Sequence, residues 1–287
     1  MDFTVDMFRE MCLKSDTERD LGLTEPEDIE YFDDIPYGMH GEWNLLDVYR
    51  PKNASDRLPV IVSFHGGGWV YGSKLTYRYY CMYLAQRGFA VVNPSYRLAP
   101  ENRFPAQFED MNKAFAFVLD NADKYGFDTD NIFAVGDSAG GMGLAIYANL
   151  LTDQEFATRF PVASPKGLRL RGIALNCGFY NSENDDQLSK VLLPEDRAEE
   201  LLPLLYIKPN ITADFPPCFI MTSTGDFLIN EPQHIIPALE QNGVRYVSKV
   251  YGDENEKPPH VFHCDIKSSI GRQANDDELE FFKSCIE

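Results

Sequence analysis

Short apolar runs alternate along this chain with longer amphipathic segments. Runs such as VIVSF, FAVVN and CFIMT have no polar residue at alternate positions, as expected of strands that are covered on both faces. The amphipathic segments between them are typical of helices. This alternation predicts one α/β domain over residues 1–287, with a mostly parallel central sheet flanked by helices on both faces.

The pattern places seven strands and five helices. The strands are expected at Asn44–Tyr49, Val60–Phe64, Ala90–Asn93, Ile132–Val135, Gly172–Asn176, Cys218–Thr222 and Val244–Val250, and the helices at Leu75–Arg87, Pro105–Lys124, Ala139–Leu150, Pro232–Asn242 and Ile266–Ser284. Two stretches do not follow the alternation. Residues 1–35 are charged and helix-prone, and about 180–214 is acidic, punctuated by proline and weakly helical. Both could cover one end of the sheet or decorate the surface.

A G-x-S-x-G motif at Gly136–Gly140 lies between a predicted strand and a predicted helix. The motif alone is weak, but in this context it indicates a nucleophile elbow, a tight turn that presents the hydroxyl of Ser138 above the sheet. Gly136 and Gly140 are needed there because a Cβ atom at either position would collide with the neighbouring strand or helix. Ser138 is therefore the candidate nucleophile.

A serine hydroxyl reacts only when a base accepts its proton, and in elbow proteins an acid and then a histidine follow the serine along the chain. His234, His260 and His263 lie downstream of Ser138. His260 closes the loop that precedes the last predicted helix, from which it can reach back to the elbow. His263 is the alternative, although local packing at the start of that helix explains it better.

The acid must orient the imidazole and stabilise its charged form. Asp226 is the best candidate, because it follows the predicted strand Cys218–Thr222 closely and lies between Ser138 and His260 in sequence. Glu231 is the alternative acid, and a carboxylate at the start of a helix would account for it equally.

Three adjacent glycines in HGGGW, at His65–Trp69, follow an early apolar strand. Such a loop can offer bare amides to the oxyanion that forms in acyl transfer. We expect the amides of Gly67 and Gly68, together with that of Ala139, to form this oxyanion hole. A phosphate-binding loop is the rival explanation, but lysine and serine stand in the wrong order for it in Gly67–Lys74.

Five blocks in this order resemble the hormone-sensitive-lipase-like carboxylesterases of the α/β-hydrolase fold. They are HGGGW (65–69), YRLAPENRFPA (96–106), GDSAGG (136–141), GD (225–226) and HVF (260–262). The resemblance implies an α/β-hydrolase fold with a small helical cap, made from residues 1–35 and about 180–214. One departure is visible, since the acid segment of the family commonly runs D-P-L-x-D and here runs Asp226–Asn230 as DFLIN.

The resemblance also implies a serine esterase that hydrolyses short-chain, acetyl-like esters through an acyl-enzyme, with Ser138, Asp226 and His260 as its triad. No metal and no cofactor are implied. Two other functions are possible alternatives. One is an arylformamidase-like amide hydrolase that uses the same triad, and the other is a non-catalytic small-molecule receptor with the same fold.

Charge and composition limit the kinds of molecule that this protein is expected to bind. The chain carries 26 basic and 45 acidic side chains, a formal net charge of −19, which disfavours nucleic acid and anionic lipid. We find no signal peptide and no apolar run long enough for a membrane span, and the six cysteines show no metal-ligand spacing. We therefore expect a cytoplasmic enzyme with a small-molecule ester substrate, and a homo-oligomer is compatible with the sequence.

Overall fold

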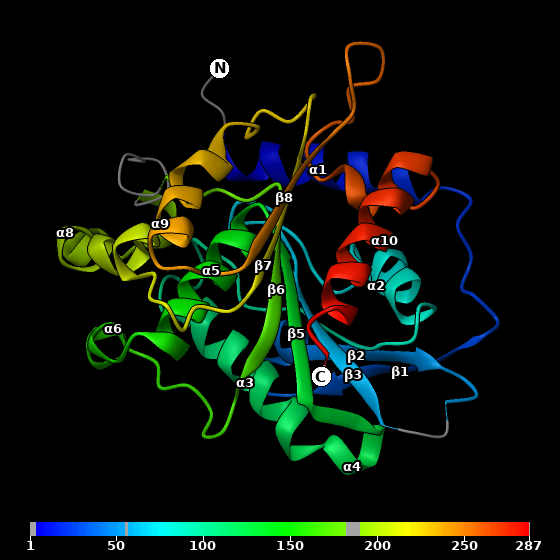
Figure 1. Cartoon of the computed structure of the whole chain (residues 1–287), viewed down its shortest axis with the longest axis horizontal. Helices are drawn as coiled ribbons and strands as arrows, with labels where there is room; N and C mark the ends of the chain where they lie inside the picture. The colour runs from blue at the N-terminus through cyan, green and yellow to red at the C-terminus, as the bar shows by residue number, and fades with distance from the viewer. Residues whose placement is uncertain (1–3, 55–56, 182–189, 287) are drawn as a thin grey trace.

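The structure is a computed structural model that describes residues 4–54, 57–181 and 190–286. Across these residues, eight strands form one sheet in the order β1-β2-β4-β3-β5-β6-β7-β8 (Figure 1). The strands are β1 (Ile29–Pro36), β2 (Leu45–Pro51), β3 (Leu58–Phe64), β4 (Ala90–Pro94), β5 (Phe127–Asp137), β6 (Leu170–Asn176), β7 (Cys218–Ser223) and β8 (Tyr246–Tyr251). β2 pairs antiparallel with both β1 and β4, and the other five pairs are parallel, so the predicted mostly parallel sheet is confirmed.

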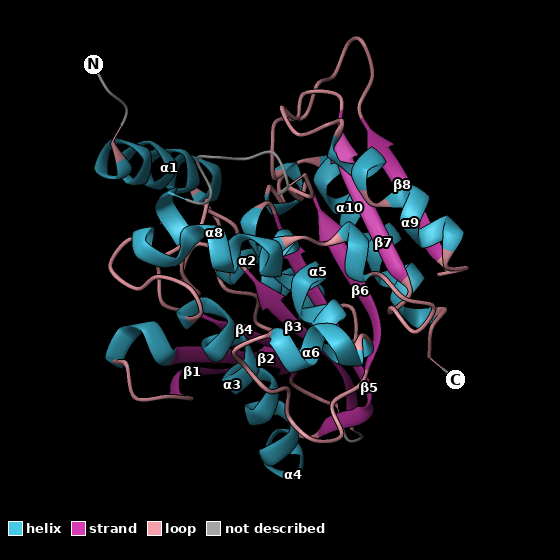
Figure 2. Cartoon of the chain, turned by 90° about the vertical axis from the view of Figure 1, so that its left-hand side faces the viewer, coloured by secondary structure: helices cyan, strands magenta, loops and turns pink. Residues whose placement is uncertain are grey.

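Helices cover both faces of this sheet. They are α1 (Val5–Asp20), α2 (Arg78–Ala85), α3 (Ala106–Asp120), α4 (Ala122–Tyr125), α5 (Ala139–Thr152), α6 (Gln154–Arg159), α8 (Ala198–Leu201), α9 (Ile236–Gln241) and α10 (Ser269–Lys283), with 3-10 turns η1 (Gly41–Asn44), η3 (Glu195–Arg197), η4 (Leu202–Leu205), η5 (Lys208–Asn210), η6 (Glu231–His234) and η7 (Phe262–Cys264). α2 and α10 lie on one face of the sheet, and α3, α5 and α6 lie on the other, which faces the viewer in Figure 2.

The side chains of β3 show why apolar runs without polar alternation become these strands. Val60 and Val62 are fully buried in the core beneath α3 and α5, whereas Ile61, between them, is fully buried in the core beneath α2 and α10. Successive side chains of a strand point to opposite faces, so a strand that is covered on both sides needs apolar residues at every position.

The amino-terminal stretch differs from the sequence interpretation. α1 ends at Asp20, and residues 29–36, which we expected to be helix-prone, form the edge strand β1 paired antiparallel with β2. Only Ile29 of this strand is fully buried, and its acidic residues face solvent. An edge strand with one weakly covered face shows little hydrophobic periodicity, which is why the pattern missed it.

The second irregular stretch falls partly outside the described residues, which omit 182–189. From residue 195 it runs through α8 and three short 3-10 turns, whose leucines join the core beneath α5. Among the helices of the described residues, none has the length and apolarity that crossing a membrane requires.

Candidate active site

Ser138 lies at the sharp turn between β5 and α5. Its φ of 49° and ψ of −118° are strained for a residue with a side chain. The Ser138 amide donates a hydrogen bond to the Asn176 carbonyl at 3.0 Å, which ties the turn to the end of β6. A Cβ atom on Gly136 would lie 2.6 Å from the Gly140 carbonyl oxygen, and one on Gly140 would overlap the Phe64 carbonyl oxygen. The geometry therefore agrees with the collisions expected for both glycines.

The carboxylate of Asp226 lies just beyond β7 and is almost completely buried. Its Oδ1 accepts hydrogen bonds from His260 Nδ1 at 2.7 Å and from the Leu228 amide at 2.8 Å, while its Oδ2 accepts one from Thr222 Oγ1 at 2.9 Å. Burial alone would raise the pKa of Asp226, but the bonds and charge of His260, with further bonds from Leu228 and Cys177, outweigh it and lower that pKa. The acid is therefore held ionised beside the imidazole.

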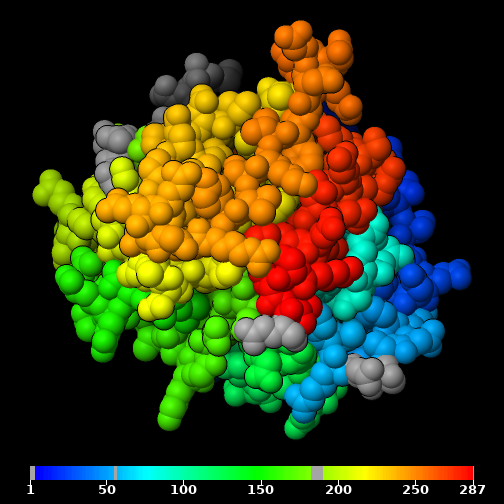
Figure 3. Space-filling view, in the orientation of Figure 1, coloured from blue at the N-terminus to red at the C-terminus, as the bar shows by residue number. Residues whose placement is uncertain are grey.

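Two neighbouring loops bring this acid and this histidine together. The loop after β7 and the loop after β8 form a parallel bridge between Gly225 and Pro259, and Ser223 Oγ donates to the Pro258 carbonyl at 2.7 Å. A Cβ atom on Gly225 would lie 2.5 Å from that same carbonyl oxygen, so this position requires glycine. The rest of the β8 loop, residues 253–257, is exposed and stands out from the surface (Figure 3).

The glycine triplet lies at the same end of the sheet, after β3. Gly67 and Gly68 have φ values of 106° and 60°, in the left-handed region that favours glycine. The Gly66 amide donates to Tyr77 Oη at 3.0 Å, but those of Gly67 and Gly68 have no acceptor among residues 4–54, 57–181 and 190–286. Ala139 is the first residue of α5, where helical amides lack intrahelical partners.

A buried hydrogen-bond chain joins this triplet to the elbow. Tyr77 accepts from the Gly66 amide and donates through its Oη to Asp137 Oδ2 at 2.7 Å, and Asp137 immediately precedes Ser138. Burial raises the pKa of Asp137 to about 7. The sequence analysis missed this role, although Asp137 stands inside the G-x-S-x-G motif.

His65 supports the triplet from beneath. Its ring stacks on Tyr96 with centroids 4.0 Å apart, and its Nδ1 lies 2.8 Å from the Gly66 carbonyl oxygen. Burial lowers the pKa of His65 to about 4, so the imidazole is neutral at neutral pH. The contacts of His65 with Tyr96 and with the Gly66 carbonyl therefore stabilise the glycine loop.

α1 packs against the outer side of the triplet, an arrangement that no local sequence pattern indicates. Arg9 of this helix donates to the Val70 carbonyl at 2.7 Å and pairs with Glu101 at 2.8 Å, and Tyr71 Oη donates to Asp16 at 2.8 Å. The ring of Phe8 lies 3.7 Å from the point that a Cβ atom on Gly68 would occupy. α1 thus lies beside the glycine loop, although Gly68 itself stays exposed.

The alternative site residues are engaged elsewhere. Glu231 Oε2 accepts from the amides of Tyr180 and Asn181 at 2.6 and 2.9 Å, which ties down the segment that follows β6. His263 is fully buried against Tyr80, and burial lowers its pKa to about 3. His234 lies in η6 beside Glu231. The structure therefore brings Asp226, and not Glu231, to His260.

Cys177 completes the surroundings of the acid. Its thiol is buried, and it, one Asp226 oxygen and one His260 nitrogen lie within 4.8 Å of one another. Burial, with the charge of Asp226, raises the pKa of this thiol well above its usual range. Metals bind the thiolate, and His260 Nδ1 already pairs with the carboxylate, so these three groups fit a hydrogen-bonded cluster better than a metal site.

Glu278 of α10 is a buried acid behind the elbow. Its carboxyl group accepts from Asn176 Nδ2 at 2.6 Å and from Tyr80 Oη at 3.2 Å. Burial raises the pKa of Glu278 from 4.5 to about 8, although these two bonds act in the opposite direction. The folded chain thus keeps a proton here that the unfolded chain releases at neutral pH.

We expect Glu278→Gln to change how stability depends on pH. With Glu278 the free energy of unfolding falls as pH rises from about 4.5 to about 8, because the unfolded chain ionises first, whereas glutamine cannot ionise. The melting temperature of the variant, relative to the parent, should rise by about 4 °C or more over this range. Glu280→Gln is the control, because Glu280 is exposed on the same helix. A difference in melting temperature between Glu278→Gln and the parent that did not change with pH would contradict the expectation.

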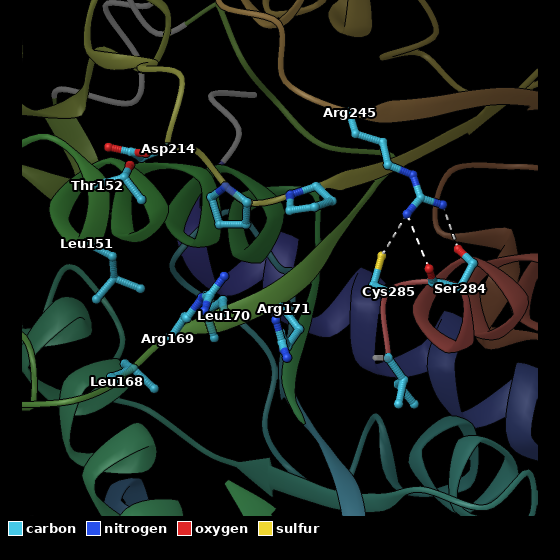
Figure 4. A pocket seen from close by; sticks show the side chains of 13 residues that line it. Leu151, Thr152, Leu168, Arg169, Leu170, Arg171, Asp214, Arg245, Ser284 and Cys285 are labelled. Atoms are coloured by element: carbon cyan, nitrogen blue, oxygen red, sulfur yellow. Dashed lines mark hydrogen bonds between the residues drawn. The ribbon is translucent and has the colours of Figure 1, made fainter. Parts of the chain in front are cut away.

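A cavity of about 410 Å³ opens at the opposite end of the sheet, where β6 and β8 begin (Figure 4). Arg169, Arg171 and Arg245 contribute to its wall, together with the carboxyl-terminal segment around Cys285. Ser138, Asp226 and His260 follow the carboxyl ends of β5, β7 and β8, which is where sheets of this kind bind ligands. The cavity is therefore separate from the candidate active site.

Comparison with known proteins agrees with this architecture. The BD-FAE family model matches residues 46–236, two thirds of the chain. An esterase of Gibberella moniliformis is 30% identical over 207 residues, which cover 68% of this chain and 65% of that protein. Carboxylesterase NlhH of Mycobacterium tuberculosis is 42% identical over 107 residues, 37% of this chain and 34% of NlhH. These matches confirm the resemblance to hormone-sensitive-lipase-like esterases.

Solved structures give the same fold. An esterase of Pyrobaculum calidifontis is 28% identical and superposes with a TM-score of 0.77 over 98% of this chain and 94% of its own. Esterase B of Lactobacillus rhamnosis superposes with a TM-score of 0.87 at 23% identity, over 98% and 95% of the two chains. The α/β-hydrolase fold is thereby confirmed. The chain nevertheless spans only about half the length of other curated relatives that it matches, 57% and 49% in two cases.

Proposed function

The chain belongs to the BD-FAE family of the α/β-hydrolase fold, and from this premise we propose that it is a serine carboxylesterase for short-chain, acetyl-like esters. The observation that carries the proposal is the pairing of a buried, ionised Asp226 with His260 at the sheet end that also bears the strained Ser138 and the glycine triplet. Nucleophile, base, acid and free amides are the four components that acyl transfer requires.

In the proposed reaction, His260 accepts the Ser138 proton as Oγ attacks the ester carbonyl carbon. The amides of Gly67, Gly68 and Ala139 donate hydrogen bonds to the resulting oxyanion. When the bond to the alcohol oxygen breaks, that oxygen takes the proton from His260 and the acyl group stays on Ser138. Water then attacks by the same route, which releases the carboxylic acid and restores the serine. Asp226 remains ionised throughout and keeps the imidazole oriented, as its lowered pKa allows.

Short acyl chains are favoured in this proposal because α1 lies beside the glycine loop and its Phe8 ring is close to Gly68, where it would limit the length of the acyl chain. We assign α1 and the described part of the stretch at about 180–214 to a small cap over the single α/β-hydrolase domain. Esterase B of Lactobacillus rhamnosis, which shares the fold, has been crystallised with a C4-C4 tributyrin phosphonate inhibitor. A butyryl group is of the size that we propose here.

A series of 4-nitrophenyl esters from acetate to decanoate tests the function. We expect kcat/KM to be at least about tenfold higher for acetate or butyrate than for decanoate, because the longer chain would meet the cap. Phe8→Ala should reduce this preference, whereas Met7→Ala, exposed on the same helix, should keep it. A preference for decanoate would refute the short-chain assignment. If none of the esters were hydrolysed, the assignment as an esterase would itself be refuted.

A further inference from the structure

Phe227 is an exposed aromatic residue that the proposed mechanism does not use. It follows Asp226 directly, and it is 76% exposed although its neighbour is buried. Its ring centroid lies 4.4 Å from that of the His260 imidazole, with 47° between the ring planes. The Leu228 amide, bonded to Asp226 Oδ1, and the Ile229 amide, bonded to the Asp226 carbonyl, fix the turn that presents this ring.

Single exposed apolar side chains are common and need no explanation by themselves. Contact with His260 sets Phe227 apart. His260 delivers a proton to the departing alcohol oxygen in the proposed reaction, so the alcohol must pass beside the imidazole. A ring that touches the imidazole and is open to solvent is then placed to contact the alcohol part of the ester.

The charges near this ring restrict which alcohol would be accepted. Asp253, Glu254 and Glu256 are exposed in the loop that leads to His260, and the chain has a formal net charge of −19. An alcohol that carries a carboxylate or phosphate would be repelled. A flat, uncharged ring could instead cover the exposed face of Phe227, and aromatic pairs gain more than their buried area alone provides.

We propose that Phe227 is a specificity-determining residue that stacks on an uncharged aromatic alcohol, so that the preferred substrates are short-chain esters of arylmethyl alcohols. This inference rests on the proposed function and names its substrate class. The aromatic face belongs to the side chain of Phe227, in the segment Asp226–Asn230, so we expect the preference to depend on this residue.

Benzyl acetate and ethyl acetate test the inference, because their alcohols have similar acidity and their acetyl-enzymes are identical. Phe227→Ala should lower kcat/KM about tenfold for benzyl acetate and less than about twofold for ethyl acetate. Phe227→Tyr should retain the preference for benzyl acetate, because tyrosine also has a flat aromatic ring. Val250→Ala, which removes an exposed apolar side chain from β8, should change neither value. The pH profile for ethyl acetate should be the same in Phe227→Ala as in the parent.

Equal losses for the two esters, or a shifted pH profile, would mean that Phe227 acts only through His260 and would overturn the inference. Binding separates this failure from a failure of the proposed function. In a Ser138→Ala background, saturation-transfer NMR should detect benzyl acetate, and the added Phe227→Ala change should weaken the signal. If the parent hydrolyses neither ester but this binding depends on Phe227, the aromatic subsite stands and the esterase does not. If the esters are hydrolysed but the binding signal is unchanged by Phe227→Ala, the esterase stands and the aromatic subsite does not.

Discussion

Ser138→Ala is expected to lower kcat/KM for 4-nitrophenyl acetate by at least about a thousandfold, because no other group at the elbow can form the acyl-enzyme. Alanine keeps the Cβ atom and loses only the hydroxyl, and the amide of residue 138 keeps its bond to the Asn176 carbonyl. The fold should therefore be retained, and circular dichroism and the melting temperature check this. Initial rates across a range of ester concentrations provide the measurement.

Covalent labelling gives the same prediction an independent readout. An organophosphorus ester should modify the parent at one site per chain, which peptide mass spectrometry should locate at Ser138, and the variant should stay unlabelled. Ser248→Ala is the control, since Ser248 is exposed on β8 and remote from the elbow in sequence. Turnover by Ser138→Ala within tenfold of the parent would exclude this serine as the nucleophile. An unlabelled parent would favour a non-catalytic receptor.

Asp226→Asn should lower kcat by about 10³–10⁴-fold, the second largest effect that we expect. Four groups direct hydrogen bonds at this carboxylate, from His260, Leu228, Thr222 and Cys177. An amide brings two N–H donors into a site built for an acceptor, so the imidazole would be held in the wrong tautomer. The negative charge that stabilises the imidazolium would also be lost.

Glu231→Gln is the matched comparison for this acid. It too replaces a carboxylate with an amide, but Glu231 binds backbone amides of Tyr180 and Asn181 and does not touch His260. We expect kcat to change less than about threefold. Similar losses in the two variants would show that the rate responds to loop structure in general, and the assignment of Asp226 would fail.

Local chemistry made the elbow visible in the sequence. Gly136 and Gly140 are required by contacts with residues close by in the chain or on the adjacent strand, and the apolar run before them marks a covered strand. The motif, the strand and the helix therefore appear together over about fifteen residues. The same holds for Gly67 and Gly68, whose positive φ values favour glycine wherever the loop lies.

Features that depend on contacts between segments far apart in the chain could not be predicted from the sequence pattern. β1 is a strand because β2 pairs with it, and its acidic, half-exposed residues carry little strand pattern of their own. The position of α1 depends on Arg9 meeting Glu101, 92 residues away, and no periodicity records such a contact. The same is true of the link from Tyr77 to Asp137 and of the exposed ring of Phe227 beside His260.

The sequence by itself determined the parallel sheet, the tight turn at Ser138 and the glycine loop after β3, because glycine spacing and apolar runs act over short distances. It left two acids and two histidines as alternatives. Only the tertiary structure selected Asp226 and His260 as partners, because an imidazole meets a carboxylate only where the loops after β7 and β8 are joined. That junction depends on contacts between segments more than thirty residues apart, such as the hydrogen bond that Ser223 Oγ donates to the Pro258 carbonyl.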